Sequence, residues 1–196
     1  MCIRDSLGPE RGGLGYGQLK LALLNELLGR SQWAPVVFGC QAPDSGNAEI
    51  LAHYGTEAQR ERYLQPLLDG EIVSSFSMTE PQAGADPREF KCQATRDGDD
   101  WVIRGEKYFS SHADFADFLI AMVITDPEVP VHKGASMMLV PGDAPGLEVI
   151  RSVGLSGEPL GHGHHPHLRY NDVRVPAENV LGGPGQAFAI AQTRLG

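Results

Sequence analysis

Apolar residues in the first 70 positions recur every three or four residues, which is the period of an amphipathic helix. The pattern predicts helices over residues 17–30, 44–55 and 56–70. We expect Gly29 to end the first helix and Asp44 to cap the start of the second. The stripes that we expect to be buried are Leu23, Leu24, Leu27 and Leu28, then Ile50, Leu51 and Tyr54, then Leu64, Leu67 and Leu68.

The third of these helices carries its own start and stop signals. Thr56 and Gln59 have the spacing of a capping box, in which each side chain satisfies a backbone N–H of the other. Pro66 has no N–H to donate, so we expect it to kink the last turn.

After Gly70 the apolar period changes from near 3.6 to two, which indicates strands. The predicted strands cover residues 72–79, 91–105, 107–111, 117–126, 135–143, 147–152 and 168–177. Asp97-Gly98 interrupts the second of these segments and predicts a hairpin. Short strands at this spacing indicate an antiparallel barrel or sandwich. The helical period returns from Gly182.

The chain is therefore predicted to be α+β, with three segments. Residues 1–70 would form part of an amino-terminal helical domain, residues 71–180 a middle β domain, and residues 181–196 the first turns of a carboxyl-terminal helical domain. The pattern of residues 1–6 does not continue smoothly into residue 7 and beyond, and we exclude them from the fold prediction. We expect the chain to be a piece of a longer protein.

Composition excludes some classes of function. A formal net charge of −9 leaves no dominant basic face for nucleic acid. The longest strongly apolar run, residues 118–124, is too short to span a bilayer. Cys2, Cys40 and Cys92 are far apart and form no CxxC pair, so we expect no disulfide framework and a reducing compartment.

Motifs for several other chemistries are missing. The chain has no complete GxGxxG dinucleotide motif, no phosphate loop and no GxSxG nucleophile elbow. Residues 161–167 hold His162, His164, His165 and His167, and histidine-rich tracts can bind metal. Because no cysteine is near and glycine and proline break the tract, we interpret it as a solvated loop and predict no metal site. A loop that titrates near neutral pH is a third interpretation.

Three stretches, taken in order, carry a family resemblance. They are "FSMTEPQAGADP", "DDWVIRGEKYFSSHADFADFLIAM" and "LRYNDVRVPAENVLGGPGQAF". In this combination the chain resembles the acyl-CoA dehydrogenases, flavoproteins that desaturate acyl-CoA thioesters. The resemblance covers residues 12–196. Taken alone, the Thr-Glu-Pro corner would be interpreted as a strand end with a proline turn capped by Thr79.

The resemblance implies which residues contact the flavin ring of FAD. A flavin edge alternates hydrogen-bond donors and acceptors, which backbone groups and a hydroxyl can match. Gly84 would let the backbone approach a bulky ligand, and Phe109 would pack on the ring system. The implied FAD contacts are Phe76, Met78, Thr79, Gly84, Ala85, Phe109, Ser110 and Ser111. We interpret Trp101 as a core residue instead.

Two departures limit what the resemblance implies. The family corner usually has serine where this chain has Ala85, so only the backbone N–H of Ala85 remains to bind acyl-CoA. The catalytic glutamate of the family lies in the carboxyl-terminal domain, so we expect it beyond residue 196 and assign no catalytic residue here. Glu80 is expected to order its own turn. We therefore expect the chain alone to bind FAD weakly and to lack turnover.

The resemblance also implies partners and a compartment. The substrate would be an acyl-CoA, the electron acceptor electron-transfer flavoprotein, and the full-length protein a homodimer or homotetramer. We expect a bacterial cytoplasmic protein, or a mitochondrial or peroxisomal one in a eukaryote. Two alternatives stay open: an acyl-CoA oxidase or flavin monooxygenase of the same fold, and a non-catalytic β-domain that binds a partner.

Overall fold

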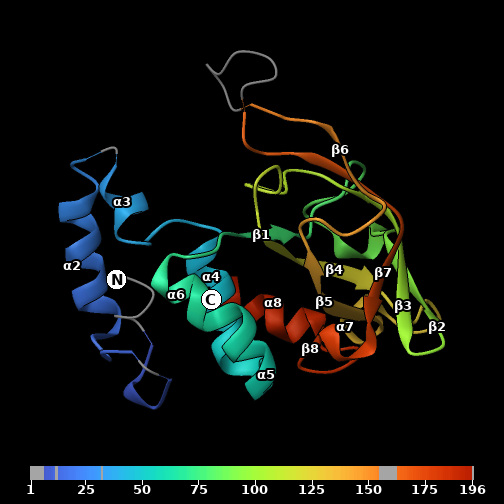
Figure 1. The fold of residues 1–196 in the computed structure, drawn as a ribbon, viewed down its shortest axis with the longest axis horizontal. Coiled ribbons are helices and arrows are strands. Elements are labelled where there is room, and N and C mark those ends of the chain that lie inside the picture. Colours follow the sequence, from blue (N-terminus) through green and yellow to red (C-terminus); the bar gives the residue numbers. More distant parts are fainter. Residues whose placement is uncertain (1–6, 12, 32, 155–162, 196) are drawn as a thin grey trace. The chain divides into compact units, whose positions relative to one another are not determined.

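The structure is a computed structural model that describes residues 7–11, 13–31, 33–154 and 163–195 (Figure 1). The chain divides into two compact units, residues 1–72 and residues 73–196. The first unit is helical and the second is built on a β-sheet.

The helices of the first unit agree with the three that the apolar period predicts. Their bounds are η1 Pro9–Arg11, α2 Gly17–Leu28, α3 Ala34–Val37, α4 Asp44–Tyr54, α5 Glu57–Gln59, η2 Arg60–Leu64 and α6 Gln65–Asp69. The last three follow one another without a break. No helix of the described residues is long and apolar enough to cross a membrane.

The apolar stripe of α2 is not buried, which corrects the prediction. None of the residues of α2 is buried, and Leu23 and Leu27 have 57% and 58% of their surface exposed. A helix stripe is buried only when another element packs over it, and the described residues of this chain leave the stripe open.

Helix α4 has the predicted bounds and buries Ile50 and Leu51 completely. Asp44 is not the N-cap, however, because Pro43 holds that position. The Asp44 carboxylate instead lies in the first turn, where it interacts favourably with the positive end of the helix dipole.

The capping box at Thr56 is confirmed. The Gln59 side-chain oxygen accepts from the Thr56 N–H at 3.0 Å, and the Thr56 hydroxyl accepts from the Gln59 N–H at 3.2 Å. The helical segment widens into a π turn over Arg60–Leu64 before it reaches Pro66 in α6. A helix that contains a proline must lose a backbone hydrogen bond, and a π turn is one way to accommodate such a defect.

The second unit contains an eight-stranded sheet. The strands are β1 Ser74–Ser77, β2 Gln93–Asp97, β3 Asp100–Lys107, β4 Phe118–Ile124, β5 Ala135–Pro141, β6 Leu147–Arg151, β7 His167–Pro176 and β8 Val180–Leu181. Their order is β6-β7-β3-β2-β4-β5-β8, with β1 beside β4. The short helices η3 Pro87–Glu89, α7 Val131–Gly134 and η4 Ala177–Asn179 connect them, and α8 Ala187–Leu195 ends the unit.

The sheet folds over to enclose one core, as a sandwich does. Strands β2 and β4 are joined by a single residue pair, Gln93 with Ile124, so the two halves of the sheet can face each other. Alternate residues of both halves fill the space between them. The buried cluster includes Ala94, Ile103, Leu119, Ala121, Val123, Met138, Val140, Leu168, Tyr170, Val173 and Val175, with Trp101 packed against it.

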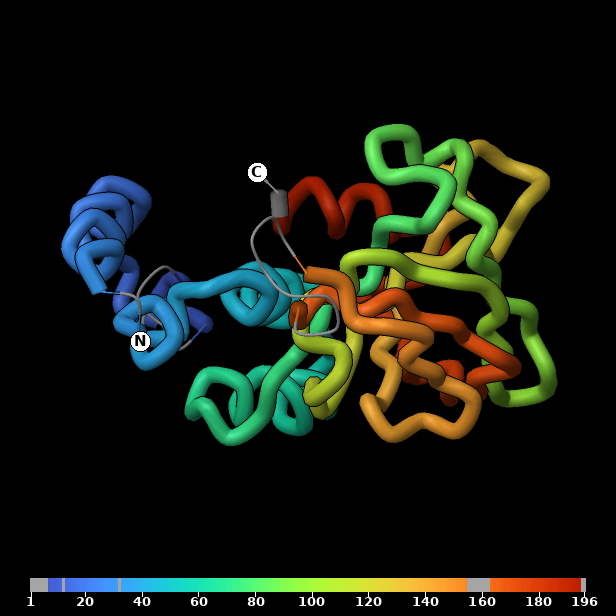
Figure 2. The backbone as a smooth tube through the Cα atoms, turned by 90° about the horizontal axis from the view of Figure 1, so that it is seen from above, coloured from blue at the N-terminus to red at the C-terminus, as the bar shows by residue number. Residues whose placement is uncertain are grey.

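The predicted α+β class is thus confirmed, but the sheet is mixed rather than antiparallel throughout. Strand β1 pairs with β4 in parallel, from Ser74 opposite Phe118 to Ser77 opposite Ala121. The chain leaves β1, passes through the β2–β3 hairpin and returns into β4, a path that can be followed in Figure 2. A parallel pair needs such a long connection, and the corner after β1 is the beginning of it.

Most predicted strands are confirmed, including the hairpin, where Asp97 pairs with Asp100. The strand predicted over residues 107–111 is wrong beyond Lys107. Residues 108–111 form a turn, in which Phe109 has a positive φ of 57°. Local β-propensity suggests a strand here, but the chain turns back towards β4 after Lys107. Residues 108–111 therefore cannot continue the pairing of β3 with its neighbours.

Cys40 is disulfide-bonded, which the expectation of no disulfide framework did not predict. Cys92 is a free thiol, 1% exposed, and belongs to the buried core cluster of the second unit. Burial raises the pKa of Cys92 to about 12, because the thiolate would be poorly solvated there.

Gly105 lies on β3 beside Cys92. Its φ is +140°, and a Cβ at this position would come within 2.6 Å of the Cys92 Cα. The register between β3 and β7 also shifts between Ile103 and Gly105, as at a β-bulge. Glycine is therefore required both by the backbone conformation and by the neighbouring chain.

We expect Gly105→Ala to lower the free energy of unfolding by roughly 2–5 kcal/mol, because conformational strain and overpacking add. Gly98→Ala is the matched control, since Gly98 also has a positive φ of 63° but has open space around it. It should cost only about 1–2 kcal/mol. Urea unfolding of both variants measures the difference, and equal midpoints would contradict the argument.

Candidate functional site

A pocket of about 340 Å³ opens beside the corner that follows β1. It is lined by Phe76, Met78, Thr79, Gly84, Phe109 and Arg194. These residues come from the end of β1 and its corner, from the turn after β3, and from α8. Segments far apart in the sequence therefore meet at one place.

The corner is held by a buried ion pair between Glu80 and Lys107. The two charged atoms lie 2.9 Å apart, and the side chains are 1% and 0% exposed. Lys107 also donates to the Met78 carbonyl oxygen at 2.8 Å, and its ammonium lies 4.7 Å from the centre of the Phe90 ring. Buried charges are tolerated only when they are paired and hydrogen-bonded, as both are here.

Glu80 orders its own turn, as predicted. Besides Lys107, its carboxylate accepts the backbone N–H groups of Lys91 and Cys92 and the side-chain amide of Gln82. The backbone of Glu80 also exchanges two hydrogen bonds with Ala83. This network closes the loop between β1 and β2 and fixes the path of residues 78–84.

The turn after β3 forms the facing part of the pocket. The Tyr108 N–H donates to the Thr79 carbonyl oxygen at 2.8 Å, which joins this turn to the corner. Phe109, in the left-handed conformation, is 47% exposed, and its ring lies 4.2 Å from that of Tyr108 in an edge-to-face arrangement. The positive φ turns the Phe109 ring out of the core, where a strand residue would have followed the pleat.

Ser110 does not line the pocket. Its side chain is fully buried, and its hydroxyl lies 2.9 Å from that of Ser77. Tyr170 donates to the same Ser77 hydroxyl at 2.9 Å, so three hydroxyls form a chain behind the turn. Burial raises the pKa of Tyr170 well above its usual range, so it stays protonated and donates.

Ser111 turns to the other side. Its hydroxyl lies 2.7 Å from Nδ1 of His165 and is half-buried. Like Ser110, it does not line the pocket, and neither does Ala85, which is exposed at the far end of the corner.

The structure therefore brings Phe76, Met78, Thr79, Gly84 and Phe109 together around one pocket and leaves Ala85, Ser110 and Ser111 outside its lining. The assignment of these residues to a flavin stays a prediction. The separation has a simple reason, because neighbouring residues in a turn point in different directions while a sequence motif lists them side by side.

Arg194 lines the same pocket and was not predicted. Its guanidinium lies 3.9 Å from the centre of the Phe76 ring, and burial lowers the pKa of Arg194 to about 10. The available signal was a lone arginine at the end of the apolar helix "AFAIAQTRL". An arginine in that position is ordinarily interpreted as a helix-end charge.

The histidine tract makes pairwise contacts. His164 lies 3.1 Å from Asp114, and His167 lies 2.9 Å from Glu106. His162 lies outside the described residues. Among those that the structure describes, no group of three or more histidine, cysteine, aspartate or glutamate side chains could hold a metal ion.

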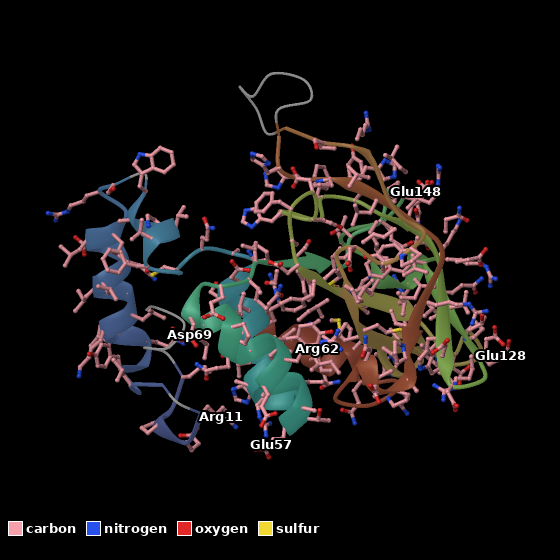
Figure 3. All side chains as sticks on the ribbon, viewed as in Figure 1. Arg11, Glu57, Arg62, Asp69, Glu128 and Glu148 are labelled. Carbon is pink, nitrogen blue, oxygen red and sulfur yellow. The ribbon has the colours of Figure 1, made fainter. Side chains whose placement is uncertain are left out.

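A larger pocket, about 710 Å³, lies in the first unit. Its lining includes Glu10, His53, Arg60 and Arg11, the last of which is labelled in Figure 3. None of the residues that the sequence analysis singles out for binding lies there. Size alone does not identify a ligand site. The smaller pocket combines aromatic rings, a threonine hydroxyl and an arginine, a more specific set of groups for a ligand.

We expect Glu80→Gln or Lys107→Met to lower the free energy of unfolding by about 3–5 kcal/mol, because each leaves an uncompensated buried charge. The double variant should lose much less than the sum of the two. Urea unfolding followed by tryptophan fluorescence measures each change.

Arg88→Ala is the matched control for this ion pair. Arg88 pairs with Asp86 across an exposed bridge, with side-chain exposures of 81% and 40%. Exposed pairs contribute little, so its unfolding midpoint should hardly move. Additive losses at Glu80 and Lys107 would show that the buried pair does not act as a unit.

Comparison with known proteins covers nearly the whole chain. The profile of the acyl-CoA dehydrogenase amino-terminal domain matches residues 6–71, and that of the middle domain matches residues 75–169. The probable acyl-CoA dehydrogenase FadE2 of Mycobacterium tuberculosis is 48% identical over 188 residues, which cover 93% of this chain and 46% of that protein. Mouse acyl-CoA dehydrogenase family member 10 is 45% identical over 195 residues, 96% of this chain and 18% of that protein.

Solved structures agree with the sequence matches. A Mycobacterium abscessus protein assigned to the acyl-CoA dehydrogenases superposes with a TM-score of 0.89 at 41% identity, covering 100% of this chain and 48% of that one. The chain spans less than half the length of each of these relatives. On these matches and on its fold, the chain belongs to the acyl-CoA dehydrogenase family.

Proposed function

We propose that the chain supplies the flavin-contacting part of an FAD-dependent acyl-CoA dehydrogenase. The observation that carries the proposal is the pocket in which the corner after β1 and the turn after β3 meet. Two observations support it. The chain belongs to the family, and several of the FAD contacts that the resemblance implies line this one pocket. They are Phe76, Met78, Thr79, Gly84 and Phe109.

The lining fits a flavin ring in its chemistry. Phe76, Met78 and Phe109 offer apolar surface for the faces of a flat ring. The Thr79 hydroxyl makes no hydrogen bond to any described residue and is available to the ring edge. A volume of about 340 Å³ is at the small end of ligand pockets, which suits the ring system rather than the whole dinucleotide.

FAD, when bound, would supply the acceptor for the hydride that leaves an acyl-CoA during α,β-desaturation. The residues of this chain would bind and orient the ring. Thr79 would hold one edge by its hydroxyl, Phe109 would cover part of the ring, and the Glu80–Lys107 pair would keep the corner rigid beneath it. A site that is rigid before binding loses less entropy when the ligand enters.

No residue of this chain is proposed as the catalytic base. Glu80 is the carboxylate nearest to the pocket-forming corner, but its two oxygens already accept from Lys107, Lys91, Cys92 and Gln82. A general base needs a free lone pair within reach of the substrate. We place the base on a glutamate of a carboxyl-terminal domain, outside these residues.

The remaining parts of the proposal rest on the family. We propose an acyl-CoA substrate, electron-transfer flavoprotein as the electron acceptor, and a homodimer or homotetramer. An oxidase or monooxygenase of the same fold would differ in its reaction with oxygen. A non-catalytic binding domain would hold no flavin at all.

The test uses the protein made from the complete reading frame that contains this sequence. It should purify with one FAD per subunit and a flavin absorption spectrum. Reduction by an acyl-CoA without oxygen, followed by slow reoxidation in air, would support a dehydrogenase. Rapid reoxidation would indicate an oxidase, and a colourless protein that does not take up added FAD would overturn the proposal.

Within that protein, Thr79→Val should weaken FAD binding by about twofold to tenfold, the factor that one hydrogen bond contributes. Thr95→Val is the matched control, because Thr95 is exposed on β2 and does not line the pocket. Fluorescence titration with FAD measures both affinities. If the two variants bind equally well, Thr79 is not a flavin contact.

A further inference from the structure

Arg194 continues the buried face of α8. Ala187, Ile190 and Ala191 are fully buried. Arg194 follows the last two by four and three residues, the spacing that places side chains on one face of a helix. The helix packs against β5 and α7. The helical period therefore directs the Arg194 side chain towards the fold, where it lines the pocket.

The Phe76 ring holds the guanidinium in that position. The guanidinium carbon lies 3.9 Å from the centre of the ring, and Phe76 is fixed on β1 by its pairing with Ile120 of β4. An arginine that stacks on an aromatic face keeps its charge in a place where it is less hydrated. Burial lowers the pKa of Arg194 to about 10, so the side chain still carries its proton at neutral pH.

Arg194 carries the one formal charge among the described residues that line this pocket. The Glu80–Lys107 ion pair, which holds the corner, contributes one charge of each sign, 2.9 Å apart. The charge that the lining itself offers to a ligand is therefore positive. The other described residues of the lining are neutral, namely Phe76, Met78, Thr79, Gly84 and Phe109.

A flavin changes its charge when it is reduced. In the proposed desaturation a C–H bond of the acyl-CoA breaks, the hydrogen leaves with its electron pair to N5 of the ring, and the neutral ring gains one negative charge. The second hydrogen leaves the substrate as a proton to the base, which we place outside these residues. A fixed cation in the pocket stabilises the reduced ring more than the oxidised one, because only the reduced ring is charged.

We propose that Arg194 sets the redox preference of this site: its guanidinium, held on the Phe76 ring, stabilises the negative charge of the reduced flavin. The inference rests on the proposed function, since it requires FAD in this pocket. A charge that served only the end of α8 would act equally on oxidised and reduced FAD, so the difference between the two affinities is the quantity to measure.

The test measures the affinities for oxidised and reduced FAD and the midpoint potential of the bound flavin in the protein from the complete reading frame. Arg194→Gln should lower the preference for reduced over oxidised FAD by about tenfold to hundredfold, the effect of two unit charges within one pocket. Because a tenfold change corresponds to about 30 mV for a two-electron couple, the midpoint potential should fall by about 30 to 60 mV. Arg194→Lys keeps the charge and should retain most of the preference.

Two further variants control for loss of structure, and circular dichroism checks that each is folded. Arg194→Met is a second neutral variant whose unbranched side chain can still pack on Phe76, and it should shift the potential as Arg194→Gln does. Arg96→Gln is the matched control. The Arg96 guanidinium also lies over an aromatic ring, 5.5 Å from the centre of the Trp101 ring, but Arg96 does not line the pocket. Its replacement should leave the preference unchanged.

The outcomes separate this inference from the proposed function. If both neutral variants lose affinity equally for oxidised and reduced FAD, Arg194 binds a phosphate of FAD or shapes the pocket, and the inference is wrong. Unchanged affinities would make Arg194 a helix-end charge and would equally overturn the inference. In both cases the proposed function stands, because FAD still binds. An unsubstituted protein that binds no FAD overturns the proposed function and this inference with it.

Discussion

The buried ion pair between Glu80 and Lys107 is the contact on which the rest of the site depends. It joins the corner after β1 to the end of β3, two segments that no backbone ladder connects directly. Removing the two charges from water costs free energy, and further hydrogen bonds of each partner offset that cost. The Glu80 carboxylate accepts from the N–H groups of Lys91 and Cys92. The Lys107 ammonium donates to the Met78 carbonyl oxygen. The charged network fixes a corner whose backbone is irregular. A ladder of strand hydrogen bonds could not do so, because it requires regular, extended backbone.

The turn after Lys107 is also held by side-chain hydrogen bonds, in this case between neutral groups. Phe109 adopts a left-handed conformation that costs energy for a bulky residue. The hydroxyls beside it offset this cost, since Ser110 joins the buried Ser77–Tyr170 chain and Ser111 is held by His165. The result is an exposed aromatic ring on a turn whose backbone is fixed from behind. Strained residues of this kind persist where the surrounding structure determines them, and they gather at functional sites.

Membership of the acyl-CoA dehydrogenase family gives this arrangement its context. The β unit contributes aromatic surface, a threonine hydroxyl and a rigid corner, while Arg194 brings a cation to the same pocket from α8. A buried guanidinium beside an aromatic ring lowers its own cost through the cation–π contact. In the proposed function the chain would bind and orient the flavin ring, and the chemistry would require groups that these residues do not include.

The sequence by itself determined the α+β class, the bounds of most helices and strands, the capping box at Thr56 and the self-ordering role of Glu80. These follow from periodicity and local hydrogen bonding, which depend on neighbours in the sequence. Tertiary structure alone decided that β1 pairs in parallel with β4, that the chain turns at Phe109 instead of continuing as a strand, and that Arg194 reaches the pocket. Each of these depends on partners many residues away. It also decided which residues of "SFSMTEPQAGADP" face the pocket, because a motif records order along the chain and not the direction in which each side chain points.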